Sequence, residues 1–92
     1  MADPVARKVH IYGRVQGVFF RQWAVHQARE LAVTGWVRNL PNGSVEAYVA
    51  GEHQAVSAMV ERLRQGPQDA RIEDVTVEDA SPQENDGFSV RI

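Results

Sequence analysis

The spacing of apolar residues changes repeatedly along the chain, and each change marks the end of one element of secondary structure. Strand-like alternation gives way to a helix-like stripe, then to two strands, a second helix-like stripe and two more strands. The expected strands cover residues 7–12, 35–40, 44–50, 71–79 and 88–92, and the expected helices cover 21–33 and 54–65. The order is therefore β-α-β-β-α-β with a short fifth strand at the C-terminus.

Two helices and a mostly antiparallel sheet must share one hydrophobic core in a chain of 92 residues. The simplest arrangement places both helices on one face of the sheet. We therefore predict the α+β class and a ferredoxin-like α/β sandwich. The length is that of one domain, so residues 7–92 are expected to form it and residues 1–6 to be a flexible N-terminal tail. This fold carries many unrelated functions and identifies no chemistry by itself.

Two local signals refine this prediction. The dipeptide Asn42-Gly43 lies between two strand-like runs and indicates a hairpin, because both residue types tolerate positive φ. The alternation of the fourth strand slips between Ile72 and Val75, which is typical of a β-bulge.

Composition excludes several classes of function. The chain has no cysteine, which excludes disulfides, thiolate chemistry and cysteine-ligated metals and agrees with a cytoplasmic location. No apolar run is long enough to span a membrane, so we expect no membrane partner. The formal net charge of -2 does not favour nucleic acid, and the aromatic pattern of RNA-binding ferredoxin-like sheets is missing. We therefore expect no nucleic-acid partner.

Several polar residues are expected to lie outside any site. His10, His26 and His53 are too scattered for metal ligation and no carboxylate cluster joins them, so we expect no metal. On its strand Glu46 alternates outward and is expected to be exposed. Arg38 and Asn39 are adjacent on one strand, so Arg38 is expected to point to the opposite face of the sheet from Asn39.

The segment GRVQGVFFR, residues 13–21, joins the first strand to the first helix in the more basic half of the chain. A loop that enters a helix presents unpaired backbone N–H groups and the positive end of the helix dipole. Gly13 and Gly17 allow the backbone to curl so that several N–H groups point inward. Arg21 adds a guanidinium group suited to two phosphate oxygens. These features together indicate a phosphate-binding loop.

A plain strand-to-helix turn with a solvated arginine is the alternative, and spacing alone does not decide between the two. The segment is not a Walker A loop, because no Gly-Lys-Ser/Thr follows the glycines.

Two longer segments resemble the signature sequences of the acylphosphatase family. GRVQGVFFR resembles the phosphate loop of the family, and GWVRNLPNGSVEAYVAG, residues 35–51, resembles its strand-and-hairpin motif. The resemblance covers nearly the whole chain in length and element order. It implies hydrolysis of the carboxyl–phosphate bond of acylphosphates to a carboxylate and inorganic phosphate, without a cofactor. The expected partners are therefore a small acylphosphate and phosphate, and we expect a monomer.

The resemblance also implies roles for particular residues. Arg21 would bind the phosphoryl group, and Asn39 would hold the attacking water. The substrate-binding residues, acting through the backbone amides of loop 14–20, would be Gln16, Gly17, Val18, Phe19 and Phe20. Many relatives have a hydroxyl residue directly after this asparagine, whereas this chain has Leu40, so support from that hydroxyl is missing.

The alternative function is a non-catalytic module on the same fold that binds an anion or carbamoyl phosphate, as similar domains do inside larger proteins. The presence of both Arg21 and Asn39 favours the enzyme. A departing carboxylate needs no proton at neutral pH, and phosphoryl transfer through a loose transition state needs mainly positioning and charge stabilisation. The few residues that the resemblance implies are therefore sufficient for the reaction.

Overall fold

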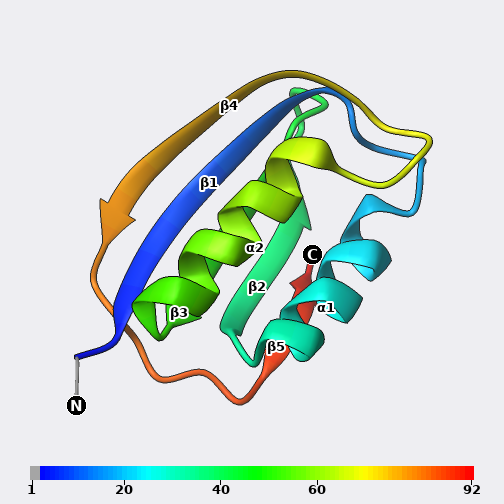
Figure 1. Cartoon of the computed structure of the whole chain (residues 1–92). Coiled ribbons are helices and arrows are strands. Elements are labelled where there is room, and N and C mark those ends of the chain that lie inside the picture. The colour runs from blue at the N-terminus through cyan, green and yellow to red at the C-terminus, as the bar shows by residue number, and fades with distance from the viewer. Residues whose placement is uncertain (1–2) are drawn as a thin grey trace.

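The computed structural model describes residues 3–92 as a five-stranded sheet with two helices on one face (Figure 1). The strands are β1 (Val5–Arg14), β2 (Thr34–Asn39), β3 (Val45–Gly51), β4 (Arg71–Ala80) and β5 (Phe88–Arg91), and the helices are α1 (Phe20–Leu31) and α2 (His53–Gln65). The strand order is β4-β1-β3-β2-β5, with β2 and β5 parallel and all other pairs antiparallel. This confirms the predicted ferredoxin-like sandwich and its short fifth strand.

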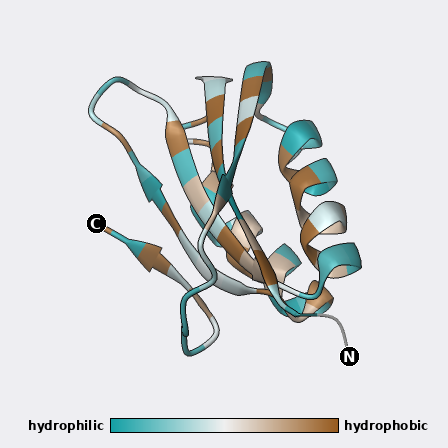
Figure 2. Cartoon of the chain, turned by 90° about the vertical axis from the view of Figure 1, so that its left-hand side faces the viewer, coloured by the Kyte–Doolittle hydropathy of each residue, from teal (hydrophilic) through white to brown (hydrophobic). Residues whose placement is uncertain are grey.

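The main hydrophobic core lies between the sheet and the two helices (Figure 2). Alternate residues of a strand point to one face, so Val9 and Ile11 of β1 lie beside Val45, Ala47 and Val49 of β3. The helices cover them with residues at helical spacing, which are Phe20, Ala24, Ala28, Val56, Met59, Val60 and Leu63. Within residues 3–92, no helix is both long enough and apolar enough to cross a membrane.

The first strand begins earlier than predicted. β1 starts at Val5, so the expected tail of residues 1–6 is too long, and Met1 and Ala2 lie outside the described residues. Ala6 is buried because it lies between Ala50 of β3 and Ala80 of β4. Small alanine side chains add little to a hydrophobic alternation, which is why the pattern did not reveal this end of the strand.

The opposite face of the sheet is partly covered by the connection between β4 and β5. The rings of Trp36 and Tyr48 stack on this face with their centroids 6.0 Å apart. The hydroxyl of Tyr48 donates a hydrogen bond to the carbonyl oxygen of Ser81 at 2.7 Å and accepts one from the N–H of Gln83 at 2.8 Å. These bonds hold the connection against the sheet.

The prediction that Glu46 is exposed is wrong. Its side chain points away from the helices, as the alternation indicated, but it is only 5% exposed. Arg38 Nε donates to one carboxylate oxygen at 2.7 Å, and His10 Nε2 lies 2.7 Å from the other. The two neighbouring strands therefore cover the carboxylate, which the pattern of one strand cannot show. Arg38 points away from the face used by Asn39, as predicted.

Helices α1 and α2 are also joined at the surface. Arg62 Nη1 donates hydrogen bonds to the side-chain oxygens of Gln27 and Glu30, both at 2.7 Å. The hydrogen bond from Arg62 holds the pKa of the Glu30 carboxyl below its ordinary value. The stabilisation from this pair is therefore present at neutral pH and is lost as the pH falls through the lowered pKa.

The β1–β4 pairing contains the predicted bulge, and this bulge lies where the chain leaves the sheet. Tyr12 pairs with Asp74 whereas Gly13 pairs with Ile72, so Glu73 is the extra residue. Gly13 has a φ of 132°, and a Cβ atom there would overlap the carbonyl oxygen of the residue that precedes Ile72. Only glycine fits at this close approach.

Candidate active site

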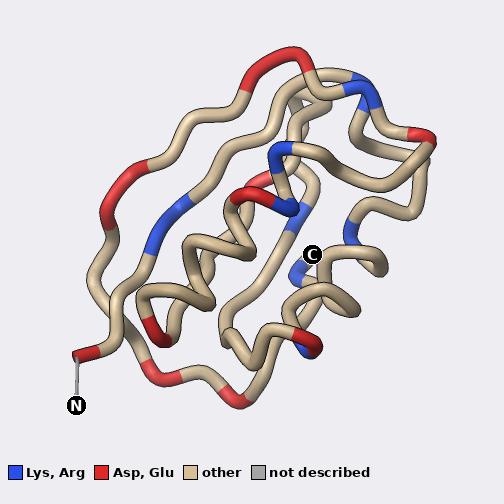
Figure 3. Tube along the Cα trace, in the orientation of Figure 1, with Lys and Arg blue, Asp and Glu red and all other residues tan. Residues whose placement is uncertain are grey.

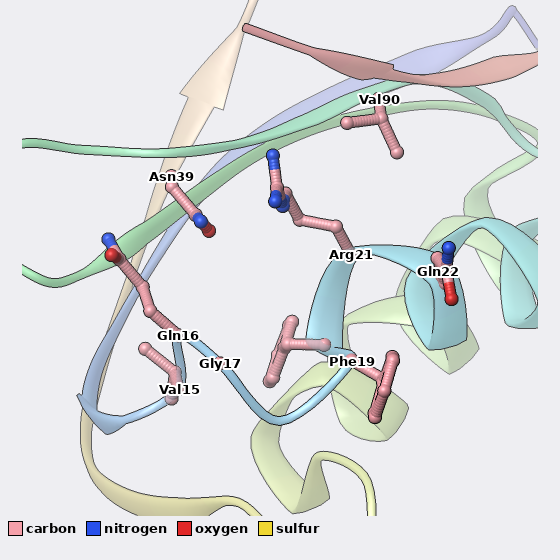
Figure 4. A pocket seen from close by; sticks show the side chains of 9 residues that line it. Val15, Gln16, Gly17, Phe19, Arg21, Gln22, Asn39 and Val90 are labelled. Atoms are coloured by element: carbon pink, nitrogen blue, oxygen red, sulfur yellow. The ribbon is translucent and has the colours of Figure 1, made fainter.

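A cavity of about 610 Å³ lies between the β1–α1 loop, the end of β2 and strand β5 (Figure 4). Its lining residues are Val15, Gln16, Gly17, Phe19, Phe20, Arg21, Gln22, Asn39 and Val90. Every residue that the sequence placed in the site lines this cavity except Val18. Val18 is half-buried and packs against the main core, so only its backbone is available for the role expected of it.

The loop reaches α1 through two residues in the left-handed region. Gly17 has a φ of 76° and Phe19, the N-cap of α1, has a φ of 61°. A bulky side chain in this region costs about 1–2 kcal/mol. Phe19 offers no side-chain cap, and the first turn of α1 contains no acidic residue. The N–H groups at this helix end are therefore available to an anion.

Arg21 lies in the first turn of α1, and its guanidinium group extends toward Asn39 and Val90 (Figure 4). Among residues 3–92, no carboxylate forms an ion pair with it. Figure 3 shows acidic residues along β4 and the β4–β5 connection, whereas the loop and the first turn of α1 carry none. The positive charge of Arg21 is therefore not neutralised by a neighbouring side chain.

Asn39 is the last residue of β2 and points into the cavity opposite the loop (Figure 4). Its Oδ1 atom is buried and is the one buried side-chain polar atom without a hydrogen-bond partner in the described part of the chain. Leaving such an acceptor unpaired costs about 1–3 kcal/mol. An unpaired acceptor in a cavity is suited to a ligand or water that can donate a hydrogen bond.

The side chain of Gln16 connects the loop to the hairpin that follows Asn39. Its Nε2 atom donates hydrogen bonds to the carbonyl oxygens of Leu40 and Ser44, both at 2.8 Å. The N–H of Leu40 also donates to the Ser44 oxygen at 2.9 Å, so both acceptors belong to one closed turn. Sequence reasoning placed Gln16 in the site through its backbone and missed this role, because its partners lie 24 and 28 residues away.

The predicted hairpin between β2 and β3 is confirmed, with one difference in its backbone. Only Gly43, with a φ of 90°, adopts a positive φ, although both Asn42 and Gly43 are residue types that tolerate it. The Asn42 side chain instead closes the turn, because its Oδ1 atom accepts a hydrogen bond from the Ser44 N–H at 3.0 Å. Asn39 contributes no side-chain hydrogen bond to this turn.

Three lining residues were not predicted from the sequence, namely Val15, Gln22 and Val90. Val90 reaches the cavity because β5 pairs in parallel with β2, which places it opposite Val37, two residues before Asn39. A short C-terminal strand has no signal that identifies its partner strand, so this contact could not be read from the sequence.

Comparison with known proteins gives consistent matches. A model of the acylphosphatase family matches residues 7–90. An acylphosphatase of Rhizorhabdus wittichii is 46% identical over 87 residues, covering 95% of this chain and 88% of that protein. An acylphosphatase of Anaeromyxobacter dehalogenans is 52% identical over 82 residues, covering 89% of this chain and 88% of that protein. The solved structure of an acylphosphatase from Coxiella burnetii has a TM-score of 0.92 and 37% identity, covering 97% of this chain and 94% of that one. The similarity therefore extends along nearly the whole chain in sequence and in fold.

Proposed function

The chain belongs to the acylphosphatase family of enzymes that hydrolyse acylphosphates, and we propose how its own residues carry out that reaction. The phosphoryl group lies against the N–H groups of residues 16–20 and is held by Arg21. Asn39 holds the attacking water. The observation that carries this proposal is the buried, unpaired Oδ1 atom of Asn39, which lies in the same cavity as Arg21.

The loop and Arg21 stabilise the negative charge of the phosphoryl group. In a loose transition state this charge is spread over three equatorial oxygens, and donors fixed in advance stabilise it without reorganisation. The planar guanidinium group of Arg21 donates to two of these oxygens. The N–H groups of the loop and of the first turn of α1 surround the third.

The water attacks phosphorus while the bond between phosphorus and the acyl oxygen breaks. Asn39 Oδ1 accepts a hydrogen bond from the water, which directs a lone pair of the water oxygen toward phosphorus. The bonding electrons leave with the acyl oxygen as a carboxylate, which is unprotonated at neutral pH because carboxyl pKa values are about 4. The proton of the water passes to the phosphate product. The cavity is lined by no histidine or carboxylate, so this route needs no side-chain acid or base.

Steady-state hydrolysis of benzoyl phosphate tests this proposal. We expect turnover that is competitively inhibited by inorganic phosphate, and by sulfate as well, because the loop recognises charge and shape. The rate should be unchanged after exhaustive treatment with a chelator. At constant ionic strength, kinetics that millimolar phosphate leaves unchanged would show that the loop is not the binding site.

Gln16→Ala is expected to lower kcat by about tenfold or more. Removing its amide breaks both bonds between the loop and the turn after Asn39, and a displacement of about 1 Å at a reacting centre can cost up to about 10²-fold in rate. The backbone amides of the loop remain, so the inhibition constant of phosphate should change much less than kcat.

Gln54→Ala is the matched control, because Gln54 is exposed on α2 away from the cavity. It should retain the wild-type kcat. If Gln16→Ala changes the unfolding midpoint but not kcat, then Gln16 stabilises the fold and does not position the site.

A further inference from the structure

We propose that the exposed apolar side chains of Phe19 and Val90, which line the cavity on either side of Arg21 (Figure 4), bind the acyl group of the substrate and select uncharged, apolar acylphosphates. This inference rests on the function proposed above and names the class of substrate for the same site. It is carried by the exposure of these two side chains, by the strained backbone of Phe19 and by a cavity volume larger than a phosphate needs.

Phe19 is 77% exposed although the next residue, Phe20, is almost fully buried in the core. The left-handed backbone at Phe19 directs these two adjacent rings to different environments. Exposing a phenyl ring on a strained residue gives the folded protein no stabilisation, and such strain clusters at functional sites. A ligand that covers this ring would remove its apolar surface from water.

Val90 is 42% exposed and lines the same cavity from β5. The large exposed hydrophobic side chains of residues 3–92 are Phe19, Val77, Val90 and Ile92, and two of these four therefore line one cavity. They come from opposite ends of the chain, and Figure 4 shows them on opposite sides of Arg21 and Gln22. Their shared position in the lining of one cavity favours a binding role over scattered exposure.

The cavity is lined by side chains of different chemistry. Gln16, Arg21 and Asn39 offer polar groups to a ligand, whereas Phe19 and Val90 offer no hydrogen bond. A volume of about 610 Å³ falls within the range of about 300–1,000 Å³ typical of organic ligands and exceeds what a phosphate needs. Because the acyl group is bonded to the phosphoryl group, the volume that the phosphate leaves is next to the acyl group.

A second hollow of about 410 Å³ adjoins the first, since Gln22 and Val90 line both. It runs between α1 and β5, where Gln22, Val25 and Arg29 follow one another at helical spacing. This groove accommodates acyl groups that extend past Val90. Arg29 lies at its far end, about 10 Å along the helix from Gln22, so an anionic acyl group would have to reach this distance to meet a charge.

The test compares benzoyl phosphate with acetyl phosphate, which share a phosphoryl group and differ in apolar acyl surface. We expect the ratio of their kcat/KM values to fall about threefold in Val90→Ala and about tenfold in Phe19→Ala, in favour of acetyl phosphate. Both substrates are measured on one preparation, so the fraction of active enzyme cancels in the ratio. Val77→Ala is the matched control, because it removes the same atoms from an exposed valine on β4 and should leave the ratio unchanged.

The possible outcomes separate this inference from the proposed function. If wild-type enzyme hydrolyses neither substrate, the proposed function and the acyl site both fail. If it hydrolyses both but Val90→Ala and Phe19→Ala keep the wild-type ratio, the acyl site alone is wrong. A preference for succinyl phosphate over benzoyl phosphate that Arg29→Gln removes would identify an anionic acyl group and overturn the apolar assignment.

Discussion

Arg21→Ala should abolish nearly all turnover of benzoyl phosphate, and Arg21→Lys should abolish most of it. An arginine that stabilises the transition state of phosphoryl transfer contributes about 10³–10⁵ in rate. Lysine keeps the positive charge but cannot donate to two oxygens from one planar group, so we expect a loss of about 10² or more even in Arg21→Lys. The measurements are kcat, KM and the inhibition constant of phosphate, which should rise in both variants.

Both variants should remain folded, because Arg21 is half-buried and forms no ion pair in the described part of the chain. Arg64→Ala is the matched control, since Arg64 is an exposed helical arginine on α2. Its Nε atom lies 3.6 Å from a carboxylate oxygen of Glu61, which is a long distance for an ion pair. It should retain wild-type kinetics. A near-normal rate in Arg21→Lys would show that a point charge is sufficient, and a near-normal rate in Arg21→Ala would remove Arg21 from the mechanism.

The fold was predictable because local patterns were consistent along the chain. The change of hydrophobic period identified all the strands and helices, and the slip between Ile72 and Val75 located the bulge opposite Gly13. The errors lie where neighbouring strands decide the outcome. Ala6 is buried by two adjacent strands, and Glu46 is buried because side chains of β1 and β2 cover its carboxylate.

The candidate site was predictable only in part. The glycines and Arg21 were consistent with an anion-binding loop but did not decide against a plain turn, and the family resemblance decided between the two and supplied Asn39. The side-chain bonds of Gln16 and the position of Val90 depend on contacts between segments far apart in the sequence. Such contacts follow from strand order and register, which a single sequence does not contain.

Asn39→Ala should lower kcat by about 10²-fold or more, the scale observed when one positioned polar group is deleted at a reacting centre. The loop and Arg21 remain, so the inhibition constant of phosphate should change little. A fall in kcat without a matching loss of phosphate binding is the behaviour expected when an interaction made mainly in the transition state is removed.

The alternative for Asn39 is a structural role at the end of β2, and the hydrogen bonds argue against it. The turn that follows is closed by the side chain of Asn42 and by backbone bonds between Leu40 and Ser44, and Gln16 holds it from outside. Asn39 Oδ1 takes part in none of these bonds. Removing a buried acceptor that has no partner should leave the unfolding midpoint unchanged or slightly raised.

Asn42→Ala is expected to lower stability without lowering kcat, which is the opposite of the result expected for Asn39→Ala. It removes the side chain that accepts the Ser44 N–H, so it should lower the free energy of unfolding by about 0.5–1.5 kcal/mol while its folded fraction keeps a near-normal kcat. Measuring kcat, the inhibition constant of phosphate and the unfolding midpoint on both variants separates the two roles. If folded Asn39→Ala turns over normally, the water is held by another group, and the unpaired Oδ1 atom has no part in the chemistry.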